Sequence, residues 1–220
     1  MTGTLKIVAF SDTHGRRPWF KIPDGDVLVF AGDMTLHGRL DEVAKFNAFL
    51  GSLPHHHKLV IAGNHDACFE SQPQESRTAL TNAIYLQDEF TLIEGVKFYG
   101  SSWQPEFRNM AFNLPRGEAL QAKWNLIPAD TDILITHTPP WGQNDKTFLG
   151  SAVGCRELSE TVKRLKIPRH IFGHIHEAHG RSASAETLFA NVSVCNLLYL
   201  PIRRAFVFGF PRKVDDKIES

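Results

Sequence analysis

The sequence has few cysteines and no long apolar segment. Its three cysteines, Cys68, Cys155 and Cys195, are an odd number and show no C-x-x-C spacing. This argues against a disulfide framework and a thiolate zinc site, and it favours a reducing compartment. No stretch approaches the roughly 18 consecutive apolar residues of a membrane-spanning helix, and residues 1–10 lack the basic start and long apolar stretch of a signal peptide. We therefore expect a cytoplasmic protein.

An excess of charge of either sign is also missing. The 24 Lys and Arg residues balance the 24 Asp and Glu residues, and the basic residues form no long run. This balance argues against an extended nucleic-acid surface and against a membrane partner, because both attract clustered positive charge. It is compatible with a small anionic substrate that is held locally by metal ions or single arginines.

Length and composition indicate one globular domain. Of the 220 residues, 42% are hydrophobic and 22% are charged, and we find no internal repeat, linker or low-complexity segment. A chain of this length can bury a sizeable core. We expect a single domain over residues 1–220, with a frayed tail at residues 213–220.

Apolar periodicity predicts a layered α/β fold. Five short runs rich in β-branched residues are typical of buried strands: residues 5–10, 27–31, 58–62, 133–136 and 170–172. Residues 39–50 and 156–165 repeat apolar side chains near a helical period. Residues 84–103 and 187–208 alternate strand-like pieces with turns, which predicts a second, largely antiparallel sheet. We expect the two sheets to pack face to face with helices outside.

Each of the five strand-like runs is followed by residues of the types that bind metal ions. These are Asp12 and His14, then Asp33, then Asn64 with His65 and Asp66, then His137, and finally His174 and His176. In open α/β sheets the carboxyl ends of the strands meet at one crevice, so these loops are predicted to form one site. Oxygen donors mixed with imidazole nitrogens favour Mn, Fe, Zn or Ni over Ca.

Asp33 is the candidate for a ligand that two cations share. Its carboxylate has two oxygens, it follows Gly32, and it lies between groups that would serve separate cations. Two divalent ions about 3.5–4 Å apart can clamp the attacking and leaving oxygens of an in-line displacement at phosphorus. The predicted reaction is therefore hydrolysis of a phosphate ester by metal-bound hydroxide, without a protein nucleophile.

These motifs, in this order, resemble those of the calcineurin-like metallophosphoesterase superfamily. More narrowly they resemble its class III cyclic nucleotide phosphodiesterases and the small metallophosphoesterase-domain-containing phosphodiesterases. The stretches that carry the resemblance are SDTHGR (11–16), GDMTLHG (32–38), GSSWQPEF (100–107), ITHTPPWG (135–142) and FGHIHEAHG (172–180). It covers nearly the whole chain, and it implies a four-layer α/β/β/α sandwich of two mixed sheets flanked by helices. The implied activity is hydrolysis of small phosphodiesters, in particular cyclic nucleotides, supported best by manganese.

The resemblance also implies a role for each motif residue. One cation would be held by Asp12, His14 and His176, the other by Asn64, His137 and His174, with Asp33 as the bridge. His65 would protonate the leaving alkoxide, oriented by Asp66. Because both His174 and His176 are present, the resemblance implies an active enzyme.

Other functions compete with this interpretation. A phosphoprotein or phosphomonoester phosphatase would need paired arginines for a dianionic phosphate, and Arg16, Arg17 and Arg39 are the candidates. A nucleotide-binding scaffold with weak activity is another alternative. A nuclease is disfavoured by the balanced charge.

Several side chains outside the motifs can be interpreted in two ways. His37 and His179 are close enough to the motifs to line a pocket, but they also suit turns. Four aromatic residues would either stack on a nucleobase at the pocket or fill the core: Trp103, Phe107, Phe112 and Trp141.

The remaining candidates are predicted to be structural. His55, His56 and His57 follow Pro54 and indicate a solvated turn. His170 lies in a predicted strand and is expected in the core or at an edge. Cys68 is expected to pack beneath the loop that precedes it. The sequence leaves homodimerisation open.

Overall fold

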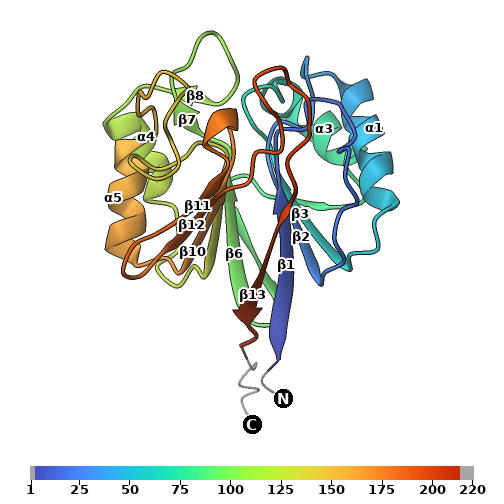
Figure 1. The fold of residues 1–220 in the computed structure, drawn as a ribbon. Coiled ribbons are helices and arrows are strands. Elements are labelled where there is room, and N and C mark those ends of the chain that lie inside the picture. Colours follow the sequence, from blue (N-terminus) through green and yellow to red (C-terminus); the bar gives the residue numbers. More distant parts are fainter. Residues whose placement is uncertain (1–2, 214–220) are drawn as a thin grey trace.

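The protein consists of two β-sheets packed face to face, with helices on both outer sides (Figure 1). The computed structural model describes residues 3–213. Strands of the first sheet are β13 (Phe206–Pro211), β1 (Thr4–Phe10), β2 (Val27–Ala31), β3 (His57–Ile61) and β4 (Ile84–Tyr85), in that order. Strands of the second are β11 (Gly180–Ala183), β12 (Leu188–Asn191), β10 (Arg169–Phe172), β9 (Ile133–Thr136), β6 (Val96–Ser101) and β5 (Glu89–Ile93).

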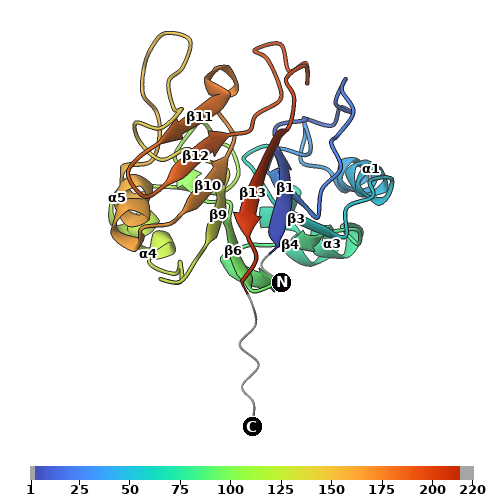
Figure 2. The same ribbon diagram turned by 60° about the horizontal axis from the view of Figure 1, so that its bottom comes forward.

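Helices cover the outer face of each sheet, as both views show (Figures 1 and 2). The first sheet carries α1 (Leu40–Gly51), α2 (Cys68–Ser71) and α3 (Pro73–Ala79), and the second carries α4 (Glu118–Trp124) and α5 (Arg156–Leu165). A separate strand pair, β7 (Gln104–Pro105) with β8 (Asn113–Leu114), and the 3-10 turn η1 (His176–Ala178) complete the fold.

The alternation of side chains along β1 explains its almost continuous apolar run. Ile7 and Ala9 belong to the core between the sheets, whereas Val8 and Phe10 pack with α1. A strand that is buried on both faces needs apolar residues at every position. A third core lies beneath α4 and α5. These layers are the predicted four-layer α/β/β/α sandwich.

The second sheet is mixed, so the prediction of a largely antiparallel sheet was wrong. Its strands β12, β10, β9 and β6 are parallel, and only β11 and β5 at its two edges pair antiparallel. The cause is the connections: α4 lies between β6 and β9, and α5 lies between β9 and β10. Such helical crossovers join parallel strands. In addition, β4 and β13 join the first sheet rather than the second.

Predicted boundaries differ from the observed ones by little. The strand predicted at residues 58–62 is β3, which begins and ends one residue earlier, and α5 has the predicted bounds. Of the predicted frayed tail, only Lys213 lies within the described residues, and its ammonium contacts Asp132 at 2.7 Å. Within residues 3–213, no helix has the length and apolar character needed to cross a membrane.

Candidate metal centre

The five predicted loops converge at one end of the molecule, where the carboxyl ends of β1, β2 and β3 face those of β9 and β10. They therefore come from both sheets of the sandwich. Backbone hydrogen bonds join the loops within each sheet, from His14 N–H to the Asp33 carbonyl (3.0 Å) and from Gly173 N–H to the His137 carbonyl (3.0 Å). Across the sheets, the N–H of His174 donates to the carboxylate of Asp12 at 3.1 Å.

The backbone of these loops is held in an unusual conformation. Asp12, His14, Asp33 and His174 all have positive φ, between 46° and 69°. Such residues cost about 1–3 kcal/mol each and persist only where the surroundings impose them. The neighbouring Gly63 is required for space, because a Cβ there would lie 2.3 Å from Oδ1 of Asp33. The strained backbone of these loops brings the side chains together, and it lowers the local stability.

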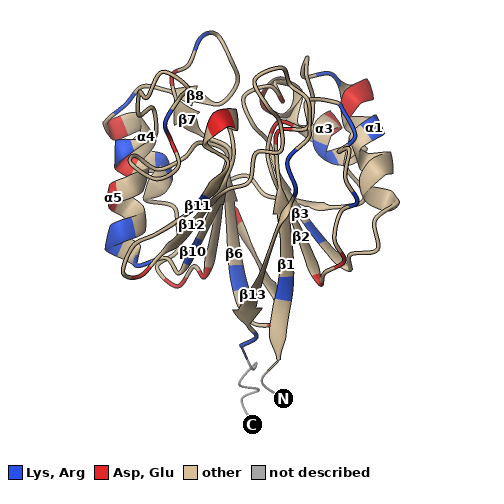
Figure 3. Cartoon of the chain, viewed as in Figure 1, with Lys and Arg blue, Asp and Glu red and all other residues tan. Residues whose placement is uncertain are grey.

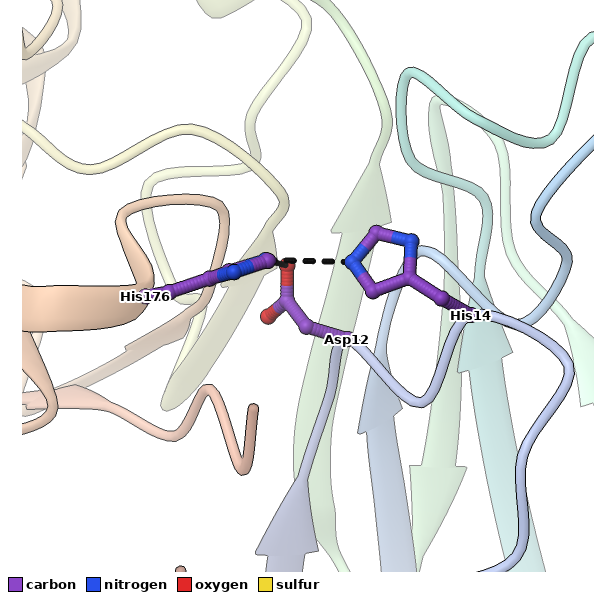
Figure 4. Close-up of side chains that lie close together, drawn as sticks. All are labelled: Asp12, His14 and His176. Carbon is purple, nitrogen blue, oxygen red and sulfur yellow. Dashed lines mark hydrogen bonds and ion pairs between the residues drawn. The ribbon is translucent and has the colours of Figure 1, made fainter. Parts of the chain in front are cut away.

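Asp12, His14 and His176 form the first donor group (Figure 4). The Nε2 atoms of the two imidazoles are 3.0 Å apart, and Nε2 of His176 lies 3.4 Å from Oδ1 of Asp12. Nδ1 of His176 donates to the carbonyl of Asn196 at 3.2 Å, and this contact directs Nε2 toward the other donors. A backbone carbonyl behind the ring is the usual support of a metal-binding histidine.

A second donor group surrounds His137. Its Nδ1 donates to the carbonyl of Ala31 at 2.9 Å, and its Nε2 lies 2.9 Å from Oδ1 of Asn64. The ring of His174 is 5.0 Å from that of His137, centre to centre. The imidazole and amide donors expected for one cation thus lie side by side.

Asp33 lies between the two groups. Its Oδ2 is 3.8 Å from Nε2 of His14 and 3.4 Å from Nε2 of His137. Its Oδ1 accepts the backbone N–H of His65 at 2.8 Å, which fixes the carboxylate plane. Asp33 also belongs, with Asp12 and His137, to a group whose ligand atoms are all within 4.8 Å of one another.

The carboxylates are ionised at neutral pH. Burial opposes ionisation of Asp12, but hydrogen bonding to His176 and the charge of that imidazole outweigh it and lower the pKa of Asp12 to about 2. Burial is likewise outweighed at Asp33, where the charge and hydrogen bond of His137 hold the pKa well below the usual range. Burial alone dominates at two imidazoles, lowering the pKa of His14 to about 4 and that of His174 to about 3.

A divalent cation binds ionised carboxylates and neutral imidazoles, and Asp12, Asp33, His14 and His174 have these forms. At His176, burial lowers the pKa, but the hydrogen bond to Asp12 and its negative charge exceed that effect and raise it. The pKa of His137 shows which charge the surroundings favour at the centre of the site. Burial lowers its pKa, but the negative charge of Asp33 exceeds that effect and raises the pKa to about 9. The site therefore stabilises a positive charge between Asp33 and His137, whether it is carried by a proton or by a metal ion.

This competition predicts the pH dependence of metal binding. Below the His137 pKa of about 9 the cation-free imidazole is protonated, so a cation must displace that proton. We expect the apparent affinity for Mn²⁺ to rise by about tenfold per pH unit between about pH 6 and pH 8, with proton release on binding. Metal titration at several pH values measures this, and an affinity independent of pH would rule out His137 as a ligand.

Asp66 does not orient His65, and that prediction was wrong. Its buried carboxylate instead accepts the backbone N–H groups of Asp33, Met34, Thr35 and Gly63, at 2.8 to 3.2 Å. Asp66 thereby ties the loop after β2 to the loop after β3. The ring of His65 is positioned by the carbonyl of Leu36, which accepts from Nδ1 at 3.0 Å.

A cavity of about 530 Å³ opens over the donors. Asp33, Asn64, His65, His174 and His176 are among the residues that line it. Among the lining residues that the sequence analysis missed are Arg108, Arg116 and Tyr199. The ring of Tyr199 lies 4.5 Å from that of His14 and 5.2 Å from that of His176. These residues are in irregular loops outside every motif, so no local pattern marked them.

Of the four aromatic candidates, one lines the cavity and three do not. Phe107 lines the cavity, and its ring lies 5.6 Å from that of His174. Phe112 is buried in the core, Trp103 packs against Phe112, and Trp141 stacks with Arg156. Stacking on a ligand thus remains a prediction for Phe107.

The histidines outside the motifs have structural surroundings. His55 is buried, with Nε2 3.0 Å from the carbonyl of Pro23, so the solvated turn predicted for it was wrong. His37 is exposed, and its backbone N–H donates to Glu42. His179 stacks on Phe206. His170 and Cys68 are buried, as predicted.

The predicted phosphate-binding arginines are not among the residues that line the donor cavity. Arg16, Arg17 and Arg39 line a separate cavity of about 410 Å³ against α1, which contains none of the expected metal ligands. The guanidinium of Arg39 pairs there with Asp41 at 2.9 Å.

An α/β/β/α sandwich with carboxylate, amide and imidazole donors at the ends of both sheets defines the metal-dependent phosphoesterase class. The calcineurin-like phosphoesterase family matches residues 5–178, and the chain belongs to this family. It is accordingly a metal-dependent phosphoric ester hydrolase.

Similar proteins occur in animals. The chain is 45% identical over 236 residues to metallophosphoesterase domain-containing protein 1 of Homo sapiens, covering 95% of this chain and 72% of that protein. It is 41% identical over 226 residues to a UPF0046 protein of Caenorhabditis elegans, covering 96% and 77% of the two chains.

Solved structures share the fold at low sequence identity. One matches with a TM-score of 0.69 at 17% identity, covering 96% of this chain and 100% of the other. TT1561 of Thermus thermophilus matches with a TM-score of 0.58 at 16% identity, covering 86% and 89%.

Proposed function

We propose that this protein is a binuclear phosphodiesterase that hydrolyses small phosphodiesters, cyclic nucleotides among them. The observation that carries the proposal is the position of Asp33. A single carboxylate oxygen lies within 4 Å of one imidazole from each donor group, 3.8 Å from His14 and 3.4 Å from His137. That arrangement suits a ligand shared by two cations.

We assign the donors as follows. Asp12, His14 and His176 would hold one cation, Asn64, His137 and His174 the other, and Asp33 would bridge them. Support comes from the 3.0 Å and 2.9 Å contacts inside the two groups. Mixed oxygen and imidazole donors suit manganese, with iron, zinc and nickel as alternatives. When bound, such cations supply Lewis acidity that activates water and offsets charge on the phosphoryl oxygens.

His65 is the proposed general acid. Its Nδ1 is committed to the carbonyl of Leu36, so proton exchange with a leaving oxygen would take place at Nε2. The ring lines the cavity and lies 4.6 Å from that of His14. This position places a proton donor beside the two groups of expected metal ligands. The proposed ligand sets are complete without His65.

The cavity favours a diester with one planar substituent. Arg108 and Arg116 line it and would pair with the phosphate charge, while Phe107 and Tyr199 offer ring surfaces to a base. Arg16, Arg17 and Arg39, the arginines expected for a phosphatase, line a different cavity. The ring surfaces of Phe107 and Tyr199 are the feature that supports a diester with a base.

A reducing compartment such as the cytoplasm is the proposed location. All three cysteines are buried as free thiols. This is the state expected of a protein that never meets an oxidising environment.

Replacing His65 with alanine tests the general acid. We expect His65→Ala to retain its cations but to lose about 100-fold in turnover of diesters with alkoxide leaving groups. Turnover of bis(p-nitrophenyl) phosphate should change little, because nitrophenolate leaves without protonation. Elemental analysis and the two rate measurements make the comparison.

His56→Ala is the matched control, because His56 is exposed and precedes β3 at the opposite end of that strand. It should match the wild-type protein on both substrates. Equal losses on both substrates for His65→Ala would contradict the assignment of His65 as an acid.

The diester proposal itself is tested by a substrate panel. Manganese-loaded protein should hydrolyse 2′,3′- and 3′,5′-cyclic nucleotides at least about tenfold faster than phosphopeptides or nucleoside monophosphates. A preference for phosphopeptides would replace the proposal with a phosphatase, and nucleotide binding without turnover would replace it with a scaffold.

A further inference from the structure

Large apolar side chains are exposed around the opening of the donor cavity. Among the described residues, eleven large hydrophobic side chains are exposed, and seven of them lie on the loops at this end. We call these seven residues the apolar rim. The apolar rim consists of Trp19, Phe107, Phe148, Leu149, Leu197, Leu198 and Ile202. Its loops project at the end of the sandwich opposite the start of β1 (Figure 1).

Two of these loops are tight turns with apolar tips. Leu149 is 88% and Phe148 is 78% exposed, at the tip of a turn closed by the hydrogen bond from Gly150 N–H to the Thr147 carbonyl. Leu198 is 73% exposed, in a turn where the side chain of Asn196 accepts its N–H. Turn tips ordinarily carry Gly, Asn, Asp or Ser, so large apolar side chains with this much exposure are unusual there.

The loops surround one opening. Thr147, next to Phe148, and Leu197, next to Leu198, both line the donor cavity. Trp19 is joined to the last loop by a hydrogen bond from its N–H to the carbonyl of Pro201. An exposed apolar patch of this kind marks an interaction surface in a soluble domain.

Exposed basic residues accompany the apolar rim on each loop. Arg17 precedes Trp19, Arg108 follows Phe107, Lys146 precedes Phe148 and Arg204 follows Ile202, each within two positions. Figure 3 shows Lys and Arg on the loops at this end. Two acidic residues share the surface: Glu106 is exposed, and Glu177 accepts the backbone N–H of Phe148.

Another exposed apolar pair lies outside these loops and serves as a comparison. Phe90 and Leu92 on β5 are 52% and 58% exposed. The charges beside them are balanced, because Glu89 pairs with Arg77 and Glu94 pairs with Arg212. Basic residues beside apolar tips match an anionic lipid surface, where cations meet headgroup phosphates and apolar side chains enter the acyl boundary.

We propose that the apolar rim docks this protein on an anionic lipid bilayer, with the donor cavity facing the headgroups. The proposal does not depend on the proposed substrate. It revises the expectation of no membrane partner, which rested on whole-chain charge. The residues concerned come from separate loops, and only the fold brings them together.

Sedimentation with vesicles tests the docking. We expect the full chain to bind vesicles of phosphatidylcholine with about 30% phosphatidylserine at least about tenfold more tightly than phosphatidylcholine alone. Phe148→Ser/Leu149→Ser should reduce that binding by about tenfold or more, and Phe90→Ser/Leu92→Ser should leave it unchanged. All three proteins should hydrolyse a soluble diester equally, which shows that the site is intact.

Three results would overturn the proposal. The first is failure of the wild-type chain to bind phosphatidylserine vesicles. The second is equal loss of binding in the two serine variants. The third is a solution dimer that dissociates in Phe148→Ser/Leu149→Ser, because the apolar rim would then belong to a second copy of the chain.

Discussion

Asp33→Ala should lose both cations and at least about a thousandfold in diester turnover. Asp33 supplies the oxygen that lies between His14 and His137, so its removal takes a negative charge from both donor groups at once. Metal catalysis contributes several kcal/mol of transition-state stabilisation, and each 1.36 kcal/mol is about tenfold in rate. Elemental analysis of the purified variant and its rate on a cyclic nucleotide measure the two effects.

Two controls separate charge from backbone effects. Asp33→Asn keeps a side chain that tolerates positive φ and removes only the charge, so it should also lose cations. Asp130→Ala removes an exposed carboxylate and should behave as wild type. An Asp33→Ala protein that retains two cations per chain would show that Asp33 is not the bridge.

Asp66→Asn should destabilise the fold more than any exposed substitution. The Asp66 carboxylate is fully buried and accepts four backbone N–H groups as well as the hydroxyl of Thr35. An amide has one acceptor oxygen and turns donor hydrogens toward those N–H groups. The expected loss is about 3–5 kcal/mol, or a fall in Tm of roughly 10 °C for a chain of this size.

Two further Asp→Asn variants test whether the number of accepted N–H groups determines the loss of stability. Asp145 is also buried but accepts two backbone N–H groups, from Gly142 and Gly154, so Asp145→Asn should cost less. Asp41 is half exposed on α1, and Asp41→Asn should change Tm least. Thermal unfolding of cation-free proteins gives the order. A Tm for Asp66→Asn equal to that of Asp41→Asn would contradict the proposed role of Asp66 in holding the two loops.

The strands and the candidate donor loops could be located from the sequence because both leave local signals. A strand buried on both faces must be apolar at nearly every position, as β2 is. Residues such as Asp12 and His174 lie two positions after the ends of β1 and β10, where the strand pattern itself requires neither a carboxylate nor an imidazole. Their residue type and their position after a strand were sufficient to identify them as candidate metal ligands.

Features that depend on tertiary contacts were not predictable in this way. The membership of β4 and β13 in the first sheet is set by pairing with β3 and β1, far away in sequence. Likewise, the burial of His55 depends on its contact with Pro23, and the role of Asp66 depends on the loop after β2. Tyr199 lies in a loop without periodicity, so only the folded chain shows its place beside His14.

The most direct measurement is an anomalous difference map from a crystal grown with manganese. We predict two peaks at the end of the sandwich, one among Asp12, His14 and His176 and one among Asn64, His137 and His174, with Asp33 in contact with both. A single peak that Asp33 does not touch, or manganese bound elsewhere with these side chains left around nothing, would contradict a shared two-cation site.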